Sequence, residues 1–332
     1  MLNTIVGILM ILAAGYVAMK VINELWIAVK YNMGNVLMGI IAIGAVGGLM
    51  THAGYFDDKS PIITASTSAF QTPSSTEYAS GSAEQKWVVG NYAFTPTVNL
   101  RGVHPLTYTV LKNIKLSVYD KFCNSAYTPT ITSANDGRHR VGSTHYDGLG
   151  IDIRTKDLRS CGQSVRTIGK AIQSNIWQFG FEVITEDIGS NNEHIHIEYD
   201  IEIARKVSKQ AVILASDKHG IDKDLIKSII HTESRNGKHI ISNKGAIGFM
   251  QLMEPTAKEM GVKNPWDIKQ NILGGTEYIK QMLNKYNGNT EKALAAYNWG
   301  PGNMSKVHNE KSWKSKLPQE TKNYVHEITN LL

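Results

Sequence analysis

Two uncharged apolar runs near the N-terminus restrict the folds open to this chain more than any other feature. They cover residues 2–19 and 33–50, and each has about the length that a helix needs to cross a hydrocarbon core. Lys20 and Lys30 lie between them, and basic loops favour the cytoplasmic side of a membrane. We therefore expect a membrane anchor of two helices within residues 1–58, with the rest of the chain on the outer side.

Two other interpretations of these runs stay open. Residues 1–19 lack the basic residue that precedes the apolar run of a signal peptide, which disfavours a signal peptide with one remaining span. The other alternative is a buried, soluble hairpin. Residues 59–86 are rich in Ser and Thr and contain two prolines, a composition that buries little apolar surface. We interpret them as a flexible linker.

The stretch from residue 87 to residue 200 alternates short β-like runs with turn residues. The runs include KWVVGNYAF (86–94) and FEVIT (181–185), and one helix-like stretch lies near 163–177. This pattern predicts a small α+β domain. The two cysteines, Cys123 and Cys161, are too few for a CxxC-type metal site, and the sequence leaves open whether they form a disulfide or stay as buried thiols.

Histidines and carboxylates in two patches of this domain suggest a metal site. A catalytic zinc ion takes three protein ligands and keeps a position open for water, and His145, Asp152 and His196 make a suitable set. Glu193, three residues before His196, is our candidate for the base that takes the proton of that water. On a strand His194 and His196 share a face, so His194 is expected to stabilise the oxyanion, although the two roles are interchangeable.

The first patch resembles a known family. Its pattern Ser-x-His-x-x-Gly-x-(small)-x-Asp is carried by Ser143, His145, Gly148, Gly150 and Asp152, with Gly150 at a position where Ala is common. With its late histidine it resembles the zinc D-Ala-D-Ala carboxypeptidases and L-alanyl-D-glutamate endopeptidases of the peptidase M15 group. The resemblance covers about 115 residues and implies the zinc and base roles named above.

The same resemblance implies an arginine before the motif that holds the substrate, and both Arg138 and Arg140 qualify. Other interpretations remain for this region. A His-x-His pair occurs in many ordinary strands, and the domain is also compatible with binding wall peptides without cutting them. The further acidic residues Glu186, Asp187 and Glu198 are interpreted as solvated or structural.

From residue 203 onward the apolar residues recur at helical spacings, which predicts a mainly α domain over 203–332. Gly220 is expected to end a first helix, and Asp222 to cap the next helix, which leads to Glu233. Later helices are expected over 271–288 and 291–298. Burial of Glu233 against apolar neighbours would keep it protonated as a general acid, whereas a lone helix-end glutamate would simply be solvated.

Three motifs in order accompany this glutamate. They are Glu233-Ser234, the run from Ser242 to Gln251 and the tripeptide Ala296–Asn298. Together they resemble the Slt-type lytic transglycosylases, relatives of goose-type lysozyme, over about 130 residues. One departure is Glu254, which intervenes before Pro255 where many members have the proline directly.

The resemblance implies non-hydrolytic cleavage of the bond between MurNAc and GlcNAc in peptidoglycan by a single carboxyl group. Most glycosidases use two carboxylates, and the motifs contain no second one. Ser242 and Tyr297 would orient Glu233 and the sugar, and Met250, Gln251 and Asn298 would line the glycan groove. Met250 and Tyr297 are equally compatible with core packing, and Trp299 with either sugar stacking or packing.

The sequence therefore predicts a multidomain wall-degrading enzyme with a zinc cofactor: a transmembrane hairpin, an α+β zinc peptidase-like domain at 87–200 and a mainly α lysozyme-like domain. Peptidoglycan and the membrane are its expected partners, with a virion or secretion machine as a further one. The formal net charge of +6 suits an anionic polymer, and no dense Lys/Arg block interleaved with aromatics indicates nucleic acid. Phage infection is the preferred setting. A wall-binding scaffold and a bacterial secretion, conjugation or remodelling enzyme are the alternatives.

Overall fold

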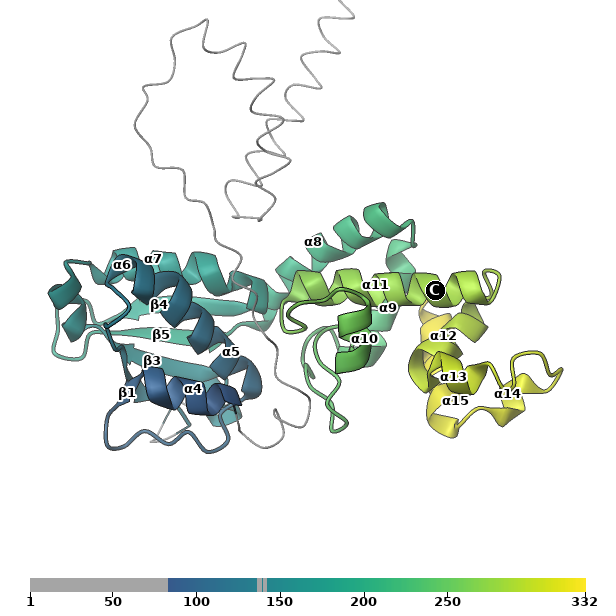
Figure 1. Cartoon of the computed structure of the whole chain (residues 1–332), viewed down its shortest axis with the longest axis horizontal. Helices are drawn as coiled ribbons and strands as arrows, with labels where there is room; N and C mark the ends of the chain where they lie inside the picture. The colour runs from purple at the N-terminus through teal and green to yellow at the C-terminus, as the bar shows by residue number, and fades with distance from the viewer. Residues whose placement is uncertain (1–82, 136–138, 140–141) are drawn as a thin grey trace, which may run out of the picture. The chain divides into compact units, whose positions relative to one another are not determined.

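The structure is a computed structural model, and it describes residues 83–135, 139 and 142–332 (Figure 1). The predicted membrane anchor, the linker up to residue 82, and both Arg138 and Arg140 lie outside these residues. Of the helices that the structure describes, none combines the length and the apolar character that a bilayer span requires.

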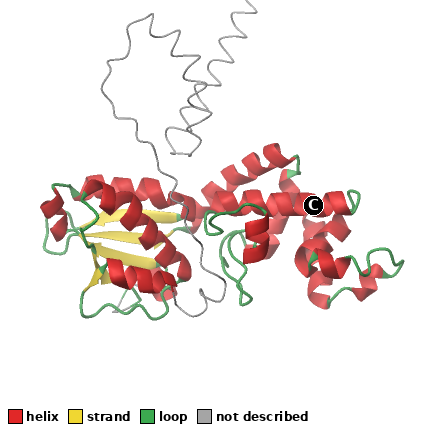
Figure 2. Ribbon diagram, viewed as in Figure 1, coloured by secondary structure: helices red, strands yellow, loops and turns green. Residues whose placement is uncertain are grey.

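One five-stranded sheet organises the first half of the described chain (Figure 2). Its order is β1-β2-β3-β5-β4, and only the β1–β2 pair is parallel. In the β3–β5 pair, Asp152 lies opposite His196, so two predicted metal ligands are cross-strand neighbours. The strands are β1 (Ala93–Phe94), β2 (Thr130–Ser133), β3 (Gly150–Arg154), β4 (Phe181–Glu186) and β5 (His194–Tyr199).

Helices pack on this sheet because each presents an apolar stripe. In α7, Ser164 caps the first turn, and Ile168, Ile172 and Ile176 recur every four residues on the buried side. Gln173 of the same helix bonds to the backbone of β4 at Phe181 and Val183. The α-helices of this half are α4 (Ala83–Asn91), α5 (Pro105–Ile114), α6 (Asp120–Phe122) and α7 (Val165–Ile176), joined by a π-helical segment Lys115–Tyr119 and 3₁₀ turns at Thr144–Asp147, Lys156–Cys161 and Trp177–Phe179.

The two cysteines form a disulfide, a choice that the sequence left open. Cys123, at the end of α6, is bonded to Cys161, and their Cα atoms lie 4.8 Å apart. The bond closes a loop across 38 residues of sequence and ties the α6 end to the turn Lys156–Cys161. Such bonds persist in oxidising compartments.

The second half of the described chain is helical. Asp200 caps α8 and Gly220 ends it in a left-handed conformation, while Asp222 caps α9 as predicted. The expected helices over 201–220, 271–288 and 291–298 are confirmed. The helices are α8 (Ile201–His219), α9 (Lys223–Ser234), α10 (Glu254–Glu259), α11 (Ile268–Lys285), α12 (Thr290–Trp299), α13 (Pro301–Met304), α14 (Trp313–Lys316) and α15 (Gln319–Leu331).

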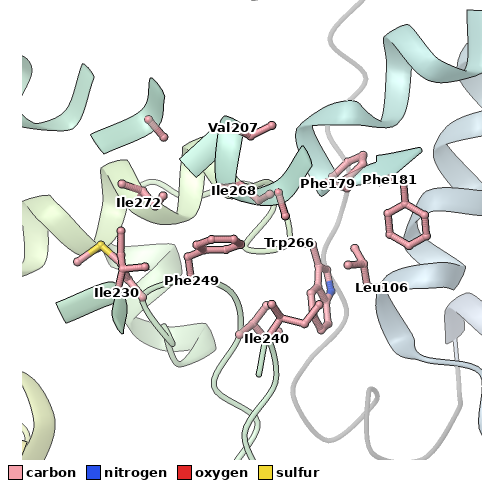
Figure 3. Packing of buried hydrophobic residues seen from close by; sticks show 14 of the residues in the cluster. Leu106, Phe179, Phe181, Val207, Ile230, Ile240, Phe249, Trp266, Ile268 and Ile272 are labelled. Atoms are coloured by element: carbon pink, nitrogen blue, oxygen red, sulfur yellow. The ribbon is translucent and has the colours of Figure 1, made fainter. Parts of the chain in front are cut away.

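A single cluster of buried apolar residues runs from Val88 to Ile328, through both the sheet-bearing and the helical half. Figure 3 shows the part of this cluster where Leu106 and Phe181 approach Trp266. The Tyr199 hydroxyl, at the end of β5, donates a 3.0 Å hydrogen bond to the Gly237 carbonyl, just beyond α9. The two halves therefore share one packed core.

The predicted fold class is wrong as a description of this molecule. The described chain is mostly helical with one small sheet, no described helix is able to span a membrane, and the sheet-bearing half does not establish a zinc peptidase fold. One local prediction also fails, because most of the run 86–94 is helix α4, with Val88 facing the core, and only Ala93–Phe94 is a strand. Helix α4 packs against α5, and tertiary burial of Val88 outweighs local β-propensity.

Candidate active sites

Glu233 lies in the last turn of α9, held there by the apolar residues before it. Ile226, Ile229 and Ile230 are fully buried, so the helix is anchored and its end is fixed in position. Ser234 is also fully buried, and its hydroxyl donates to the Ile230 carbonyl at 3.0 Å. The carboxyl group of Glu233 is therefore presented from a rigid helix end.

The surroundings of Glu233 keep its carboxyl group partly protonated near neutral pH. Burial raises the pKa of Glu233 to about 7, and the negative charge of Glu320 adds to the rise, while Tyr324 opposes it. The hypothesis that burial would make this residue an acid thus agrees with its environment in the folded chain.

Tyr324 is a neighbour of Glu233 that the sequence motifs did not indicate. It lies on α15, its ring is buried, and its hydroxyl faces the Glu233 carboxyl. The hydroxyl makes no hydrogen bond of standard geometry with any described residue, so its proton is available to the carboxylate form of Glu233.

The Ala-Tyr-Asn motif on α12 ties two neighbouring segments together. The Tyr297 hydroxyl donates to the Met250 carbonyl at 2.8 Å, and Asn298 accepts a 2.8 Å hydrogen bond from the Thr321 hydroxyl. Burial raises the pKa of Tyr297 well above its usual value, and the nearby Glu233 charge adds to this. Tyr297 is therefore a neutral hydroxyl beside the acid, placed by the same bond that fixes Met250.

The Met250 side chain is fully buried against Gly275 of α11, which fits the core-packing interpretation of that residue. Its backbone N–H donates to the Asn271 side chain at 2.8 Å. Asn271 is itself fully buried, and its amide also donates to the carbonyls of Ile247 and Pro265. Position 250 thus fixes the loop from inside the core.

Ser242 and Gln251, at the two ends of the run that also contains Met250, hold the loop at its surface. The Ser242 hydroxyl accepts from the backbone N–H of Ala246 at 2.9 Å and so closes the turn before the loop. Gln251 has a left-handed backbone conformation (φ 47°), and its side-chain amide donates to the Gly248 carbonyl at 2.7 Å. The orienting role predicted for Ser242 and the groove role predicted for Gln251 stay predictions.

The three predicted metal ligands converge in the sheet-bearing half. Ligand atoms of His145, Asp152 and His196 all lie within 4.8 Å of one another. Asp152 Oδ1 is 2.7 Å from His196 Nδ1 and 3.5 Å from His145 Nε2. Burial acts to raise the pKa of Asp152, but hydrogen bonds from both histidines outweigh it and hold this pKa well below its usual range. The carboxylate is therefore ionised, as a metal ligand must be.

The orientation of His145 also suits a metal ion. Its Nδ1 lies 2.6 Å from the Ala134 carbonyl, which only accepts, so Nδ1 donates to that carbonyl and Nε2, which faces Asp152, is the nitrogen that would bind the metal ion. A carbonyl on the outer nitrogen is the usual support of a metal-bound histidine. The residues present thus fit a zinc ion.

Gly150 allows this arrangement, and alanine would not fit there without a shift. A Cβ at position 150 would lie 2.8 Å from the His145 backbone nitrogen and 2.9 Å from its ring. Gly150 stands at a position where Ala is common in the family that the motif resembles, but in this chain an alanine there would require a neighbour to shift. Strand β3 approaches the ligand histidine so closely that only glycine is accommodated.

Glu193, the predicted base, is engaged away from the ligands. Its carboxylate accepts 2.8 Å hydrogen bonds from the Gly189 N–H and the Thr155 hydroxyl, which lower its pKa. Glu198, interpreted from sequence as solvated or structural, lies 3.4 Å from His196 Nε2. It also accepts a 2.9 Å bond from Thr144. Its position two residues beyond His196 on the same strand face was the signal that could have identified it.

Two further histidines border the ligand set. His194 Nε2 lies 3.1 Å from Glu186 and 3.9 Å from Asp152, so the residue predicted to stabilise an oxyanion is beside the site. The His139 ring stacks on His145, with ring centroids 3.9 Å apart. No motif indicated His139, which the chain places between the two arginines that lie outside the described residues.

The helical half is thus a mainly α fold that presents one largely desolvated carboxyl group from the end of a helix. Comparison with known families makes this specific, because residues 210–319 match the model of the transglycosylase SLT domain. The C-terminal part of the chain therefore carries a transglycosylase SLT domain.

Several relatives share this region. A transglycosylase of Enterobacteria phage PRD1 is 37% identical over 103 residues, covering 31% of this chain and 38% of that protein. The membrane-bound lytic murein transglycosylase F of Desulfosudis oleivorans is 35% identical over 96 residues, 27% of this chain and 21% of the relative. The membrane-bound lytic murein transglycosylase C of Edwardsiella ictaluri is 28% identical over 177 residues, 45% of this chain and 48% of the relative.

Among solved structures, an inactive mutant of the lytic transglycosylase Slt from Pseudomonas aeruginosa aligns with a TM-score of 0.35 and 26% identity, covering 40% of this chain and 24% of that one. The chain spans less than half the length of each of these relatives.

Proposed function

We propose that this protein cleaves the MurNAc–GlcNAc bonds of peptidoglycan without consuming water, with Glu233 as its acid. The observation that carries the proposal is a single carboxyl group, within the segment that matches the SLT domain, whose pKa burial raises to about 7. A carboxylic acid that is still partly protonated at neutral pH is what glycosidic bond cleavage requires.

The proposed reaction uses this one group twice. Glu233 gives its proton to the glycosidic oxygen as the bond from that oxygen to C1 of MurNAc breaks, and the N-acetyl group of the substrate supports the cationic centre. The ionised Glu233 then takes the proton of the C6 hydroxyl as O6 bonds to C1 and closes a 1,6-anhydro ring. Tyr324, with its hydroxyl facing Glu233, would stabilise the carboxylate between the two steps.

Digestion of purified peptidoglycan by the full chain tests this proposal, with products identified by mass. We expect anhydro-muropeptides from the parent and none from Glu233→Gln, whereas Glu259→Gln, an exposed helix-end carboxyl on α10, should behave as the parent. Reducing-end products in place of anhydro ends would indicate a hydrolytic lysozyme. Loss of all glycan cleavage in the parent would refute the proposal.

A second candidate activity, zinc-dependent cleavage of wall peptides, is favoured by the convergence of His145, Asp152 and His196. A bound zinc ion would supply an activated water and polarise the amide carbonyl. Glu193 remains the proposed proton acceptor, and Glu198 is its competitor because it contacts His196.

Metal content of the purified chain, measured by mass spectrometry before and after Asp152→Asn, tests the metal site apart from any activity. Peptide products that vanish with a chelator but persist in Glu233→Gln would support the peptidase. Comparison of Glu193→Gln with Glu198→Gln then identifies the base. Metal binding without any peptide cleavage would favour the alternative of a wall-binding scaffold.

We also propose that the protein acts on the wall outside the cytoplasmic membrane. The disulfide between Cys123 and Cys161 supports this, because it requires an oxidising compartment. The similarity to a phage PRD1 protein favours local wall opening during phage infection, while the bacterial relatives favour a remodelling or secretion role. Detection of the chain in purified virions, or its absence from them, separates these settings.

A further inference from the structure

A cavity of about 400 Å³ lies in the helical half, between the start of α12, the short helix α14 and the helix α15. Its lining includes Trp313 and Lys314 of α14 and a face of α15 that carries Lys322, Val325 and His326. We call it the α14–α15 pocket. Its volume falls in the range of sites that hold small ligands.

The pocket is separate from the site around Glu233. On α15, Lys322, Val325, His326 and Thr329 follow the i, i+3, i+4, i+7 spacing of one helix face. Tyr324, which faces Glu233, lies roughly half a turn around the same helix, on its other side. Helix α15 thus separates the two sites, so an occupant of the pocket would not compete with the glycan strand at Glu233.

The charges around the pocket favour an anionic group. The segment 306–322 contains five lysines and two glutamates. Glu291 is the acidic residue in the lining of the pocket. Lys314 neutralises Glu291 through contacts of 2.6 and 2.7 Å to its two carboxylate oxygens. Lys322 therefore adds a positive charge to the pocket that the Glu291 carboxylate does not balance.

Lys322 is held in place and retains donors for a ligand. Its ammonium donates one 3.0 Å hydrogen bond to the Ser315 carbonyl, and an ammonium has three N–H donors. Trp313, Leu317 and Val325 are each mostly buried and supply apolar surface beside it. A fixed ammonium next to an apolar wall is suited to a carboxylate that carries a small apolar substituent.

We propose that the α14–α15 pocket binds the C-terminal carboxylate of a wall stem peptide, with Lys322 as its cation and the Trp313 side as the contact for the terminal alanine methyl. This proposal rests on the proposed function, since it takes peptidoglycan as the substrate. The pocket would hold a stem peptide on the far side of α15 while Glu233 cuts a glycan strand, and so keep the enzyme on its polymer between cuts.

Calorimetric titration of the full chain with diacetyl-Lys-D-Ala-D-Ala tests the proposal, because this probe has a single carboxylate. A chelator is present throughout, so that the metal-ligand residues neither bind nor cut the probe through a metal ion. We expect saturable binding that weakens about tenfold when the probe is C-terminally amidated, and about tenfold in Lys322→Gln, as for a lost hydrogen bond to a charged group. Lys322→Arg should retain most of the affinity and serves as the folding control.

Lys227→Gln is the matched charge control, since Lys227 is an exposed lysine of α9 that pairs with Asp224 and does not line the pocket. The proposal is overturned if the acid probe does not bind, if the amidated probe binds equally well, or if Lys227→Gln weakens binding as much as Lys322→Gln. The same titration in Glu233→Gln should be unchanged. Failure of glycan cleavage would therefore leave this measurement intact, and failure of binding would leave the cleavage result intact.

Discussion

Two carboxyl groups in this chain, Asp152 in the sheet-bearing half and Glu233 in the helical half, are both withdrawn from solvent, but their pKa values are shifted in opposite directions. At Asp152, hydrogen bonds from His145 and His196 outweigh the effect of burial and keep the group ionised. At Glu233, burial dominates, and the hydroxyl of Tyr324 opposes it only in part. The comparison shows that the partners of a carboxyl group, and not its burial alone, decide whether it serves as a ligand or as an acid.

Substitution of each of the two carboxyl groups in turn gives the largest expected effects, one on glycan cleavage and the other on metal binding. Glu233→Gln removes the general acid and should reduce glycan cleavage by about 10²- to 10⁴-fold, while metal content is unchanged. Asp152→Asn should do the reverse. It should abolish metal binding and leave anhydro-product formation within about twofold of the parent. Product mass spectrometry and metal analysis of both variants check this. A single substitution that removed both properties would show that the sites are not independent.

Gly150→Ala sharpens the comparison from the sheet side without altering any ligand. The added methyl group would meet the His145 backbone at 2.8 Å, so the ligand histidine must shift. We expect metal affinity to fall by about 10- to 100-fold, as when the support of a ligand is lost. Gly90→Ala is the control, because no atom lies within 4 Å of a Cβ at that helical position. Equal affinities in the two variants, measured by competition with a metal chelator, would contradict the close-packing argument.

The stability of the chain should depend on pH through Glu233. The pKa of this group is raised from an ordinary value of 4.5 to about 7 in the folded chain, so the unfolded state releases its proton at lower pH. The contribution of Glu233 to the stability of the folded chain therefore becomes unfavourable as pH rises from about 4.5 to about 7. We expect Glu233→Gln to stabilise the chain by about 1–3 kcal/mol at pH 8 relative to its effect at pH 4. Thermal unfolding of both forms at the two pH values measures this, and a pH-independent difference would oppose the assigned pKa.

The smallest expected effect is a shift in the pH profile of glycan cleavage. Activity should decline as pH rises through about 7, because the acid must be protonated. Tyr324 lowers the pKa of Glu233, so Tyr324→Phe should move this decline to higher pH by a fraction of a unit, even if the maximal rate falls. Cleavage rates across pH 5–9 check the direction. A shift to lower pH would show that the hydroxyl favours the protonated form.

Local patterns were sufficient where the physics is local. The helix over 201–219, its glycine end and the Asp222 cap follow from apolar spacing and from the side chains that satisfy helix ends. The three candidate metal ligands could also be proposed from local patterns, because His145 and Asp152 belong to one short pattern and His196 to another. The structure adds that Asp152 and His196 are opposite each other on paired strands.

The remaining features depend on contacts between distant segments. The composition of the run 86–94 is typical of a strand. Most of the run nevertheless forms α4, because packing of Val88 into the shared core outweighs β-propensity. Tyr324 faces Glu233 although the two residues are 91 positions apart in the sequence, and no motif indicated this contact. Glu198 was set aside as solvated or structural, yet it contacts His196, and only the geometry of β5 and the turn at Thr144 makes it part of the site.

By itself, the sequence determined the helices α8, α9, α11 and α12, and it proposed Glu233 as the acid and three candidate metal ligands. Spacing and residue chemistry carry this information within short windows. The tertiary structure alone decided that the pKa of Glu233 is raised and that of Asp152 lowered, that Glu193 is held by Thr155, and that both halves share one core. These properties depend on desolvation and on hydrogen bonds between residues far apart in sequence, and neither exists until the chain has packed.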